Sequence, residues 1–496
     1  MPTEVAVSQT PSGPAGAKIT IRSARDVVDA INTGRVRGGN ERAIILIALG
    51  GIFIDAYDFT SLAFGLNDIA EQFQLGPAAE GIVGASIMVG ALLGALFGGY
   101  LVDKIGRYKM FMADMLFFVV AALACAFAPN PEILTASRFL MGVGIGIDFP
   151  VALAFIAEYS ALRGKGGRVT LWQPMWYIAT GTSFAVLLPL YFILPESAHG
   201  DLWRWAVGFG AVPALVVMAV RHRYMDESAS WAAKQGKLDK AVQILRKSYG
   251  VDAVLAADAA PEREGKPMAW WRGIRQLFTP RYRRRTILAG ILGGTQAAQY
   301  YAVGFALPFI IGSFLGQDTL TTIIGPLIFN FAFGVTGGFA GVALASRLGS
   351  WKLSVSGFTV CILALAGLAL LGEPTGTFGL TVAGLLLGVF VFFHSYGPGA
   401  QGMTMATLSY PTSLRGTGSG FGQMALRIGS TTSLLLFPVF SDTLGTGVFW
   451  VVIVAPALGL LTLLLIRWEP IGKDVDAEDF AEESEGGHLV NRKEPR

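Results

Sequence analysis

The stretch Gly99-Tyr100-Leu101-Val102-Asp103-Lys104-Ile105-Gly106-Arg107-Tyr108-Lys109 separates two long apolar runs, at roughly 80–102 and 109–128. Its glycines, Gly99 and Gly106, allow close helix packing and a sharp turn. Asp103 can lie against the N-terminus of another helix, where a negative charge is stabilised. The basic residues, among them Arg107, hold such a turn at the cytoplasmic face of a membrane. The stretch therefore predicts a tight, charged turn between two membrane helices.

The composition extends this pattern to the whole chain. Of 496 residues, 53% are apolar and only 15% are charged, and the mean hydropathy is +0.53. A soluble protein has about 25% charged residues, and a membrane helix needs about 20 apolar ones. This composition excludes a soluble enzyme with one membrane anchor. A β-barrel is disfavoured because its strands alternate apolar and polar residues, whereas these runs are continuously apolar.

Twelve apolar runs fall into two sets of six. We predict an all-α polytopic membrane protein with 12 transmembrane helices in two pseudo-symmetric six-helix bundles, at residues 42–220 and 286–467. A polar tail, 1–41, precedes them, and a charged tail, 468–496, with a composition typical of disorder, follows them. The stretch 221–285, rich in Lys and Arg, is predicted to be a central linker with short helices.

The distribution of basic residues predicts the orientation. Lys and Arg gather in alternate links between the apolar runs, whereas the intervening links, such as 67–79 and 195–202, contain neither. Positive charge remains on the cytoplasmic side, so both tails and the linker are predicted to be cytoplasmic. The two cysteines, Cys125 and Cys361, lie within apolar runs, which excludes a disulfide framework and a Cys-based metal site.

Two short segments of the first half recur in the second. Asp103-Lys104-Ile105-Gly106 is echoed by Ser346-Arg347-Leu348-Gly349, and Ala161-Leu162-Arg163-Gly164 by Ser413-Leu414-Arg415-Gly416. Both echoes fall at equivalent links of the two halves. Duplicated halves are typical of secondary transporters, whose binding site lies near the bilayer midplane between them.

With its 99–109 motif, the chain resembles the major facilitator superfamily, and the resemblance extends over all twelve runs. It implies two bundles that rock about a central site in alternating access. Arg138-Phe139-Leu140-Met141-Gly142-Val143-Gly144-Ile145-Gly146, followed by Glu158 and Arg163, resembles the sugar-porter and related metabolite branches. Asp226-Glu227-Ser228-Ala229-Ser230-Trp231 is similar to a box that starts a cytoplasmic helix in sugar porters. The predicted gating residues are Gly99, Asp103, Gly106, Arg107, Glu158, Arg163 and Arg415.

Charged residues inside apolar runs are costly and point to function. Asp55 and Asp58 lie three apart in the first predicted helix and therefore share a face. Arg138 and Asp148 lie in the fourth. Asp58 with Arg138 forms a candidate proton switch, as in related proton symporters, with Asp55 and Asp148 as further candidates for proton coupling. A static ion pair or cap at Asp55 and local hydrogen bonds at Asp148 remain open alternatives.

Polar residues within the runs are candidates for the substrate site. They are Gln173, Gln296, Gln299, Tyr300, Tyr301, His394 and Arg427. Gln173 stands at the offset from Glu158 that resembles a sugar-porter substrate glutamine. Packing between helices is the alternative for the amides, and a neutral, hydrogen-bonded side chain is the alternative for His394. Arg427 matches a position that faces an anionic substrate in related symporters, because guanidinium binds carboxylate or phosphate through two hydrogen bonds.

The substrate remains open between classes. Asp55-Ala56-Tyr57-Asp58, Tyr410-Pro411-Thr412 and Arg427 resemble the aromatic-acid:proton symporters. We therefore predict proton-coupled uptake of a small organic or aromatic acid. The alternatives are a sugar or polyol symporter, a phosphate symporter and, less favoured, a substrate sensor.

No metal-ligand spacing, nucleophile elbow or phosphate loop is present, so we predict neither an enzyme nor a metal or cofactor site. The expected partners are the substrate, protons and lipid, without nucleic acid. The expected form is a monomer in the bacterial inner membrane.

Overall fold

The computed structural model describes residues 19–34, 36, 41–62, 65–259, 270–315 and 319–477. Within them, nine helices are long and apolar enough to cross a membrane. One of these, Ile323–Leu371, comprises two spanning segments, because the backbone at Gly349 (φ 81°) is not helical and forms a kink between them. Helices α14 and α20 are more polar but span the second bundle beside the others. The described residues therefore hold twelve spanning segments, in agreement with the predicted fold class.

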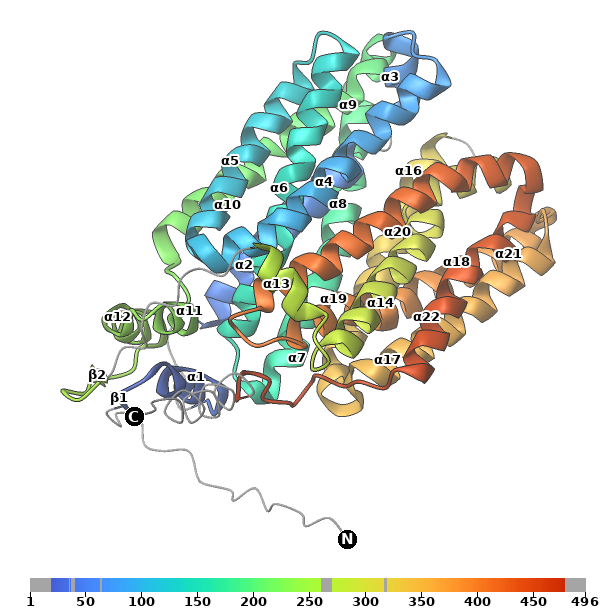
Figure 1. Cartoon of the computed structure of the whole chain (residues 1–496). Coiled ribbons are helices and arrows are strands. Elements are labelled where there is room, and N and C mark those ends of the chain that lie inside the picture. The colour runs from blue at the N-terminus through green and yellow to red at the C-terminus, as the bar shows by residue number, and fades with distance from the viewer. Residues whose placement is uncertain are drawn as a thin grey trace.

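The N-terminal bundle appears in blue to green in Figure 1. Its elements are α2 (Glu41–Ser61), α3 (Leu66–Gln72), α4 (Pro77–Ile105), α5 (Arg107–Ala126), α6 (Pro131–Glu158), α7 (Leu162–Thr170), α8 (Trp172–Ile193), a 3-10 turn η2 (Glu196–Asp201), α9 (Leu202–Phe209) and α10 (Ala211–Tyr224). Glycines set the closest contact, between α4 and α6. A side chain at Gly90, Gly94 or Gly146 would overlap backbone atoms of the facing helix. This close approach is the packing that small residues permit in membrane bundles.

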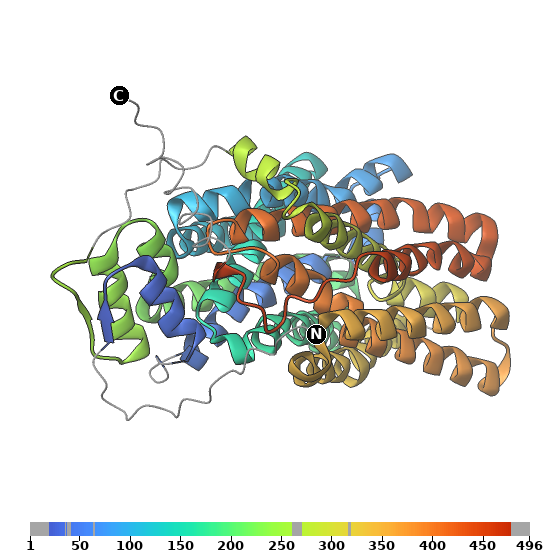
Figure 2. The same cartoon turned by 60° about the horizontal axis from the view of Figure 1, so that its bottom comes forward.

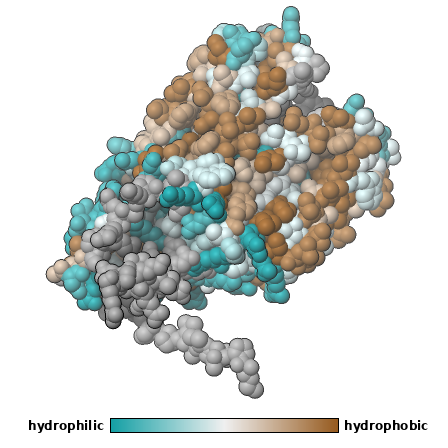
Figure 3. Space-filling view, in the orientation of Figure 1, coloured by the Kyte–Doolittle hydropathy of each residue, from teal (hydrophilic) through white to brown (hydrophobic). Residues whose placement is uncertain are grey.

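The C-terminal bundle runs from yellow to red in Figure 1. Its elements are α14 (Arg283–Val303), α15 (Leu307–Phe309), η3 (Ile310–Phe314), α16 (Thr319–Ile328), η4 (Phe329–Val335), α17 (Thr336–Leu371), α18 (Gly376–His394), η5 (Ser395–Gly399), α19 (Ala400–Leu408), α20 (Arg415–Leu444), η6 (Gly445–Gly447), α21 (Val448–Val452) and α22 (Val454–Leu465). Of these, η3, η4 and η5 are π-helical turns, which frequently accompany functional sites. Figure 3 shows mainly hydrophobic surface over both bundles.

The linker and the N-terminal segment gather at one end of the bundles, which the loop charges predict to be cytoplasmic (Figures 1 and 2). They comprise β1 (Ile19–Ile21), α1 (Ala24–Asn32), α11 (Ala229–Lys234), α12 (Leu238–Tyr249), β2 (Ala253–Leu255) and α13 (Trp270–Leu277). Strands β1 and β2 pair in parallel, Ile19 opposite Ala253. Ser228 caps α11 by accepting a hydrogen bond from Trp231 N–H, as the predicted start of a cytoplasmic helix requires.

The internal repeat extends to the structure. Gly106 and Gly349 both have positive φ, 112° and 81°, a conformation that favours glycine. The carboxylate of Glu227 accepts a hydrogen bond from Arg107 N–H at 2.9 Å, and Glu469 accepts one from Trp351 N–H at the same distance. Each half thus ends in a carboxylate that satisfies the free N–H groups of its own turn.

Residues 468–477 differ from the prediction of a disordered tail. This C-terminal segment crosses the end of the bundles at which the linker also lies (Figures 1 and 2). Its Asp474 accepts a hydrogen bond from Asn32 of α1 at 3.2 Å. Composition alone misses this ordering because the stabilising contacts come from distant parts of the chain. Residues 478–496 and 1–18 of the predicted tails lie outside the described residues.

Candidate functional site: a central cavity with two charged clusters

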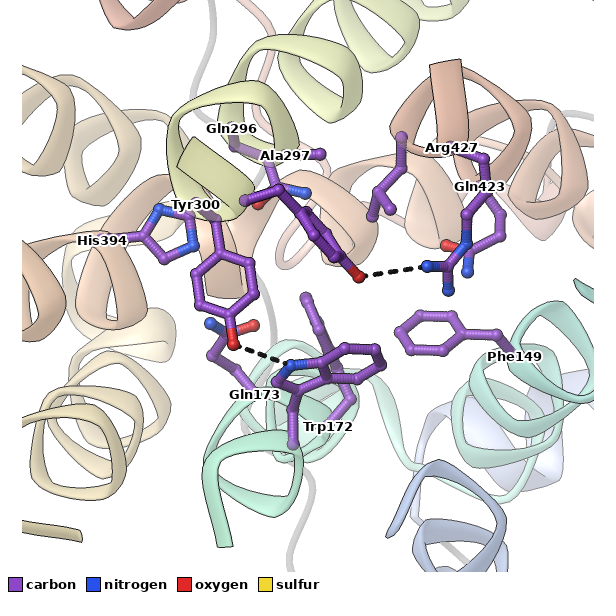
Figure 4. A pocket seen from close by; sticks show the side chains of 12 residues that line it. Phe149, Trp172, Gln173, Gln296, Ala297, Tyr300, His394, Gln423 and Arg427 are labelled. Carbon is purple, nitrogen blue, oxygen red and sulfur yellow. Dashed lines mark hydrogen bonds between the residues drawn. The ribbon is translucent and has the colours of Figure 1, made fainter. Parts of the chain in front are cut away.

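A cavity lies between the bundles, near the middle of the spanning helices. Figure 4 shows its side chains converging from both bundles. Its lining residues are Phe149, Trp172, Gln173, Trp176, Gln296, Ala297, Tyr300, Tyr301, His394, Gln423, Leu426 and Arg427. Six of the seven predicted substrate residues are therefore brought together, although they come from four different helices.

Helix α8 supplies the N-terminal wall of the cavity. Trp172 donates a hydrogen bond to the carbonyl of Ala400 at 3.1 Å and packs edge-to-face against Phe149. Gln173 lies between the two tryptophans of this helix and is 2% exposed, and its carbonyl oxygen has no hydrogen-bond partner among the described residues. A buried amide with a free acceptor beside a cavity is suited to receive a ligand donor.

Arg427 forms the cationic pole of the cavity (Figure 4). Its side chain is fully buried, donates to Tyr301 OH at 3.2 Å and lies 4.5 Å from the centre of the Phe59 ring. Its Nε has no partner, and no carboxylate pairs with it within the described part of the chain. An unpaired buried guanidinium is costly, so this arrangement favours an anion that enters the cavity.

The opposite side of the cavity carries an aromatic and imidazole pair. Tyr300 OH accepts a hydrogen bond from Trp176 at 3.2 Å, and its ring stacks on His394 at 5.1 Å. Gln299 was predicted to bind substrate, but it does not line the cavity, because its amide turns toward Nδ1 of His394 at 3.0 Å. It therefore fixes the orientation of His394, which agrees with the alternative of a hydrogen-bonded histidine.

Gln423 is a lining residue that the sequence analysis missed. It is fully buried, and neither atom of its amide has a hydrogen-bond partner among the described residues. It precedes Arg427 by four residues and therefore shares its helix face. Its position four residues before a buried arginine is the sequence feature that could have identified it as a lining residue.

Asp58 and Arg138 lie together within the N-terminal bundle. They are 0% and 3% exposed, and each acts electrostatically on the other. No salt bridge joins them, and both carboxylate oxygens of Asp58 lack a hydrogen-bond partner within the described residues. Asp58 faces Gly210, at the junction of α9 and α10. Two buried charges that are close but unpaired are suited to exchange partners or a proton.

Asp148 pairs with a residue that the sequence analysis assigned to the linker. Helix α10 continues to Tyr224, so Arg221 lies within the bundle, fully buried. Its guanidinium lies 3.3 Å from the carboxylate of Asp148 and 3.4 Å from that of Asp114 on α5. Asp55 and Asp148 interact electrostatically. Neither carboxylate oxygen of Asp55 has a hydrogen-bond partner among the described residues. Asp148 is thus part of an ion cluster, and the alternative of purely local hydrogen bonds is wrong.

The ion cluster explains Gly51 of α2. A Cβ at this position would overlap both Asp148 and Arg221. We therefore expect Gly51→Ala to lower the free energy of unfolding by about 1–3 kcal/mol, the usual cost of overpacking. Thermal unfolding of the purified protein measures the effect. Gly81→Ala is the matched control, because a Cβ there meets no atom within 4 Å. Equal stability of the two variants would contradict this account of the cluster.

A second charged cluster joins the two bundles at the end that the loop charges predict to be cytoplasmic. Asp103 accepts hydrogen bonds from the backbone N–H groups of Gly416 and Thr417, at 3.3 and 2.9 Å. These are free N–H groups at the start of α20, so the predicted contact with a helix N-terminus is confirmed. Gly99 packs directly on the backbone of Gly416. The loop motif of the first half therefore joins the two bundles.

Arg107 and Glu158 form the core of this cluster between the bundles. Arg107 is fully buried and lies 2.7 Å from Glu158 and 3.2 Å from Asp103. It also donates to the carbonyl of Thr412 in the other bundle, at 3.3 Å. Arg415 lies 3.6 Å from Glu158 and extends the cluster across the interface. Arg163, also predicted to be a gating residue, is instead exposed and takes no part in these contacts.

Asp476 of the C-terminal segment belongs to the same cluster, and the sequence analysis missed it. It accepts hydrogen bonds from Thr412 N–H and Thr412 OH, at 2.6 and 2.7 Å, and from Arg415 at 2.9 Å. Burial alone would raise the pKa of Asp476, but the charges of Arg415 and Lys234 outweigh burial and hold that pKa well below its usual range. The carboxylate therefore stays ionised and fixes the segment to the C-terminal bundle.

We expect Asp476→Ala to favour opening of the cytoplasmic end by about tenfold, because hydrogen bonds to a charged group contribute about 1.5–3 kcal/mol. Spin labels at residues 163 and 352, both exposed and on different bundles, measure the separation. The native protein should show no change between about pH 5 and 8. A carboxyl with a lowered folded pKa stabilises at every pH above its unfolded pKa of about 3.9, and this contribution is lost only on acidification below it. Unchanged distances in Asp476→Ala would contradict the role.

A metal centre has no basis in the described residues. No group of three or more His, Cys, Asp and Glu side chains in that part of the chain is arranged to hold an ion. Both cysteines are buried and free. The side chains that line the cavity supply amides, aromatic rings, one imidazole and one guanidinium.

The sequence and the fold match known transporters. The family model described as "Sugar (and other) transporter" matches residues 43–476. The inner membrane metabolite transport protein YgcS of Escherichia coli (strain K12) is 28% identical over 397 residues, covering 80% of this chain and 84% of the relative. The niacin transporter NiaP of Acinetobacter baylyi is 28% identical over 390 residues, covering 77% and 83%.

Among solved structures, the proton:xylose symporter XylE bound to 6-bromo-6-deoxy-D-glucose superposes with a TM-score of 0.74 at 17% identity. The superposition covers 88% of this chain and 98% of XylE, and it confirms the fold.

These matches agree with the helix content and with the cavity between two bundles. The relatives are transport proteins, so the chain is a transporter and not an enzyme, and transport of this kind needs no bound cofactor. It is a multi-pass protein of the bacterial inner membrane that binds a small molecule within the bilayer. The chain belongs to the sugar (and other) transporter family.

Proposed function

We propose that this protein is a proton-coupled symporter that takes up a small organic anion with a planar, preferably aromatic, body. The observation that carries the proposal is the Arg427 guanidinium, fully buried at the cavity without a carboxylate partner in the described chain. A substrate carboxylate would supply that partner through charge-assisted hydrogen bonds. Such bonds fix both the position and the charge of the ligand.

The aromatic lining supports a planar substrate. Phe149, Trp172, Trp176 and Tyr300 line the cavity, and aromatic side chains favour stacked or edge-to-face contacts with a ring. Gln173 and Gln423 have free amide atoms that can bind polar substituents on that ring. Niacin, after which the relative NiaP is named, is itself a planar aromatic carboxylate. This likeness supports the substrate class.

Proton coupling rests on the buried carboxylates. Asp58 lies beside Arg138 without a salt bridge, so it can bind a proton when Arg138 turns away and lose it when the charges approach. Asp55 interacts electrostatically with Arg427 as well as with Asp148. An anion bound at Arg427 removes that counter-charge from Asp55 and thereby favours proton uptake there. Entry of the anion and entry of a proton are thus linked energetically.

Transport then follows alternating access. The contacts of Asp103, Arg107, Glu158 and Arg415 between the bundles support the proposal that these residues form a cytoplasmic gate. We propose that residues 42–220 and 286–467 rock as two bodies about the cavity, with the linker joining them. When the gate contacts break, the cavity opens toward the cytoplasm and releases proton and anion. A single chain carries the complete site, so we propose that the monomer is the transport unit.

A sugar or polyol symporter is the second candidate. It is favoured by the three amides at the cavity, Gln173, Gln296 and Gln423, since several neutral hydrogen bonds suit hydroxyl groups. The family description also includes sugars. In that case Arg427 would serve only to hold Tyr301, and its charge would remain unpaired in the transport cycle.

Uptake into sealed proteoliposomes under an inward proton gradient decides between these candidates. Benzoate, nicotinate, inorganic phosphate, D-xylose and myo-inositol are offered separately in radiolabelled form. Protein-free liposomes are the blank, because weak acids cross bilayers unaided. Saturable, gradient-driven uptake of benzoate or nicotinate supports the proposal. Uptake of the sugars alone would overturn the organic-anion proposal in favour of the second candidate, and uptake of phosphate alone would exclude both.

A further inference from the structure

Helix α13 (Trp270–Leu277) lies across the seam between the two bundles. Trp270 donates a hydrogen bond to the carbonyl of Leu96 on α4 at 3.1 Å, and its ring packs on Phe97 at 5.5 Å. At its other end, Phe278 packs edge-to-face on Phe421 of α20, also at 5.5 Å. Figures 1 and 2 both show α13 lying over these helices. The helix is thus held on the outer side of the bundles, beside lipid-facing surface.

The exposed side of α13 combines aromatic and basic side chains. Trp271 is 66% exposed and Phe278 46% exposed. Arg272 and Arg275 are exposed, and the spacing of Trp271 and Arg275 places these two on one helix face. Aromatic rings beside arginines are typical of helices that lie in the membrane interface. Figure 3 shows hydrophilic surface at α13, next to the hydrophobic surface of the bundles.

The charge of this region is entirely positive. Residues 270–287 contain six arginines and no Asp or Glu. Arg281 and Arg285 pack on the Tyr282 ring. The other four, Arg272, Arg275, Arg283 and Arg284, are exposed and form no ion pair with a described residue. Four free guanidinium groups within 13 residues are a strong site for phosphate groups.

We propose that the α13 surface, formed by Trp271, Arg272, Arg275, Phe278, Arg283 and Arg284, binds the headgroups of anionic phospholipids in the cytoplasmic leaflet. The arginines meet the phosphates, and the two aromatic rings enter the region between headgroups and acyl chains. Lipid, not a soluble anion, is the occupant because the basic groups lie near exposed aromatic rings, and Arg275 shares a helix face with Trp271. The proposal does not depend on the identity of the transported substrate.

The test is binding of a short-chain phosphatidylglycerol to the full-length protein in an uncharged detergent, followed by native mass spectrometry. Each arginine near an anionic surface contributes about a fivefold increase in affinity. Arg272→Gln/Arg275→Gln is therefore expected to bind phosphatidylglycerol about 30-fold more weakly. Lys240→Gln/Lys247→Gln is the matched control, since it removes the same charge from exposed positions on α12. This control should bind like the native protein.

Three results would overturn the proposal. One is equal binding of phosphatidylcholine and phosphatidylglycerol, and another is an equal loss of affinity in the control variant. The third is complete displacement by millimolar inorganic phosphate, which would assign the arginines to a soluble anion. Trp271→Ala is a second test variant. It is expected to fold normally, because the side chain of Trp271 is mostly exposed. This variant should weaken lipid binding and leave the affinity for inorganic phosphate unchanged.

Discussion

Uptake of an aromatic carboxylate is expected to fall by about 10–150-fold in Arg427→Gln. The reason is the loss of a charge-assisted interaction, which contributes about 1.5–3 kcal/mol. Glutamine is nearly as long and can still meet Tyr301, so the fold should persist. Radiolabelled nicotinate and benzoate uptake into proteoliposomes measures the effect. The loss should appear as weaker substrate binding, because Arg427 is not placed in the cytoplasmic gate.

Two variants sharpen this test. Arg427→Lys keeps the charge but removes the planar fork that binds both carboxylate oxygens, so it should restore only part of the uptake. Gln423→Ala removes a neutral amide four residues away and should cost about 0.5–1.5 kcal/mol, or severalfold in affinity. If Arg427→Gln transported the carboxylates normally, Arg427 would have only a structural role. That result would favour the second candidate, a sugar or polyol symporter.

The second large effect is expected for Asp58→Asn. This variant should lose proton-driven accumulation while keeping exchange of labelled substrate across the membrane. An amide keeps the shape of the carboxyl but cannot carry the coupling proton. One coupled proton across a gradient of one pH unit sustains about tenfold accumulation, and the ratio should fall to about one in the variant. Accumulation and exchange in the same proteoliposome preparation measure both quantities.

The matched control is Asp442→Asn, which changes an exposed carboxyl of α20 and should transport normally. Asp55→Asn and Asp148→Asn test whether the ion cluster around Arg221, instead of Asp58, carries the coupling proton. Retained accumulation in Asp58→Asn, with loss in Asp55→Asn, would move the coupling site to the ion cluster around Arg221. Loss of exchange as well as accumulation in Asp58→Asn would point to a packing defect instead of proton coupling.

The substrate cavity could be predicted largely from the sequence. Gln173, Gln296, Tyr300 and Arg427 are polar residues in long apolar runs, where lipid contact is too costly to tolerate them without a function. Their common location follows from the pseudo-symmetry of the halves. Gln299 could not be separated from its neighbours in this way, because rotation about the helix axis decides which side chain reaches the cavity.

The ion cluster could not be predicted in full. Arg221 stands at the end of an apolar run, where the sequence is equally consistent with a solvated linker residue. Only the packing of α10 on α5 directs its side chain inward, to Asp114 and Asp148. Similarly, Asp476 lies in a charged, polar stretch, and its burial depends on contacts with Thr412 and Arg415. Local composition contains no information about such distant partners.

The sequence by itself determined the membrane location, the two-bundle architecture and the turn at Gly99–Lys109, because hydrophobic length, loop charge and glycine spacing are local properties. It also determined that Arg427, Asp58 and Arg138 would be buried. The tertiary structure alone decided which charges pair and which remain free. That choice depends on helix rotation and packing between segments far apart in the chain, where distances of a few ångströms separate a salt bridge from an unpaired, functional charge.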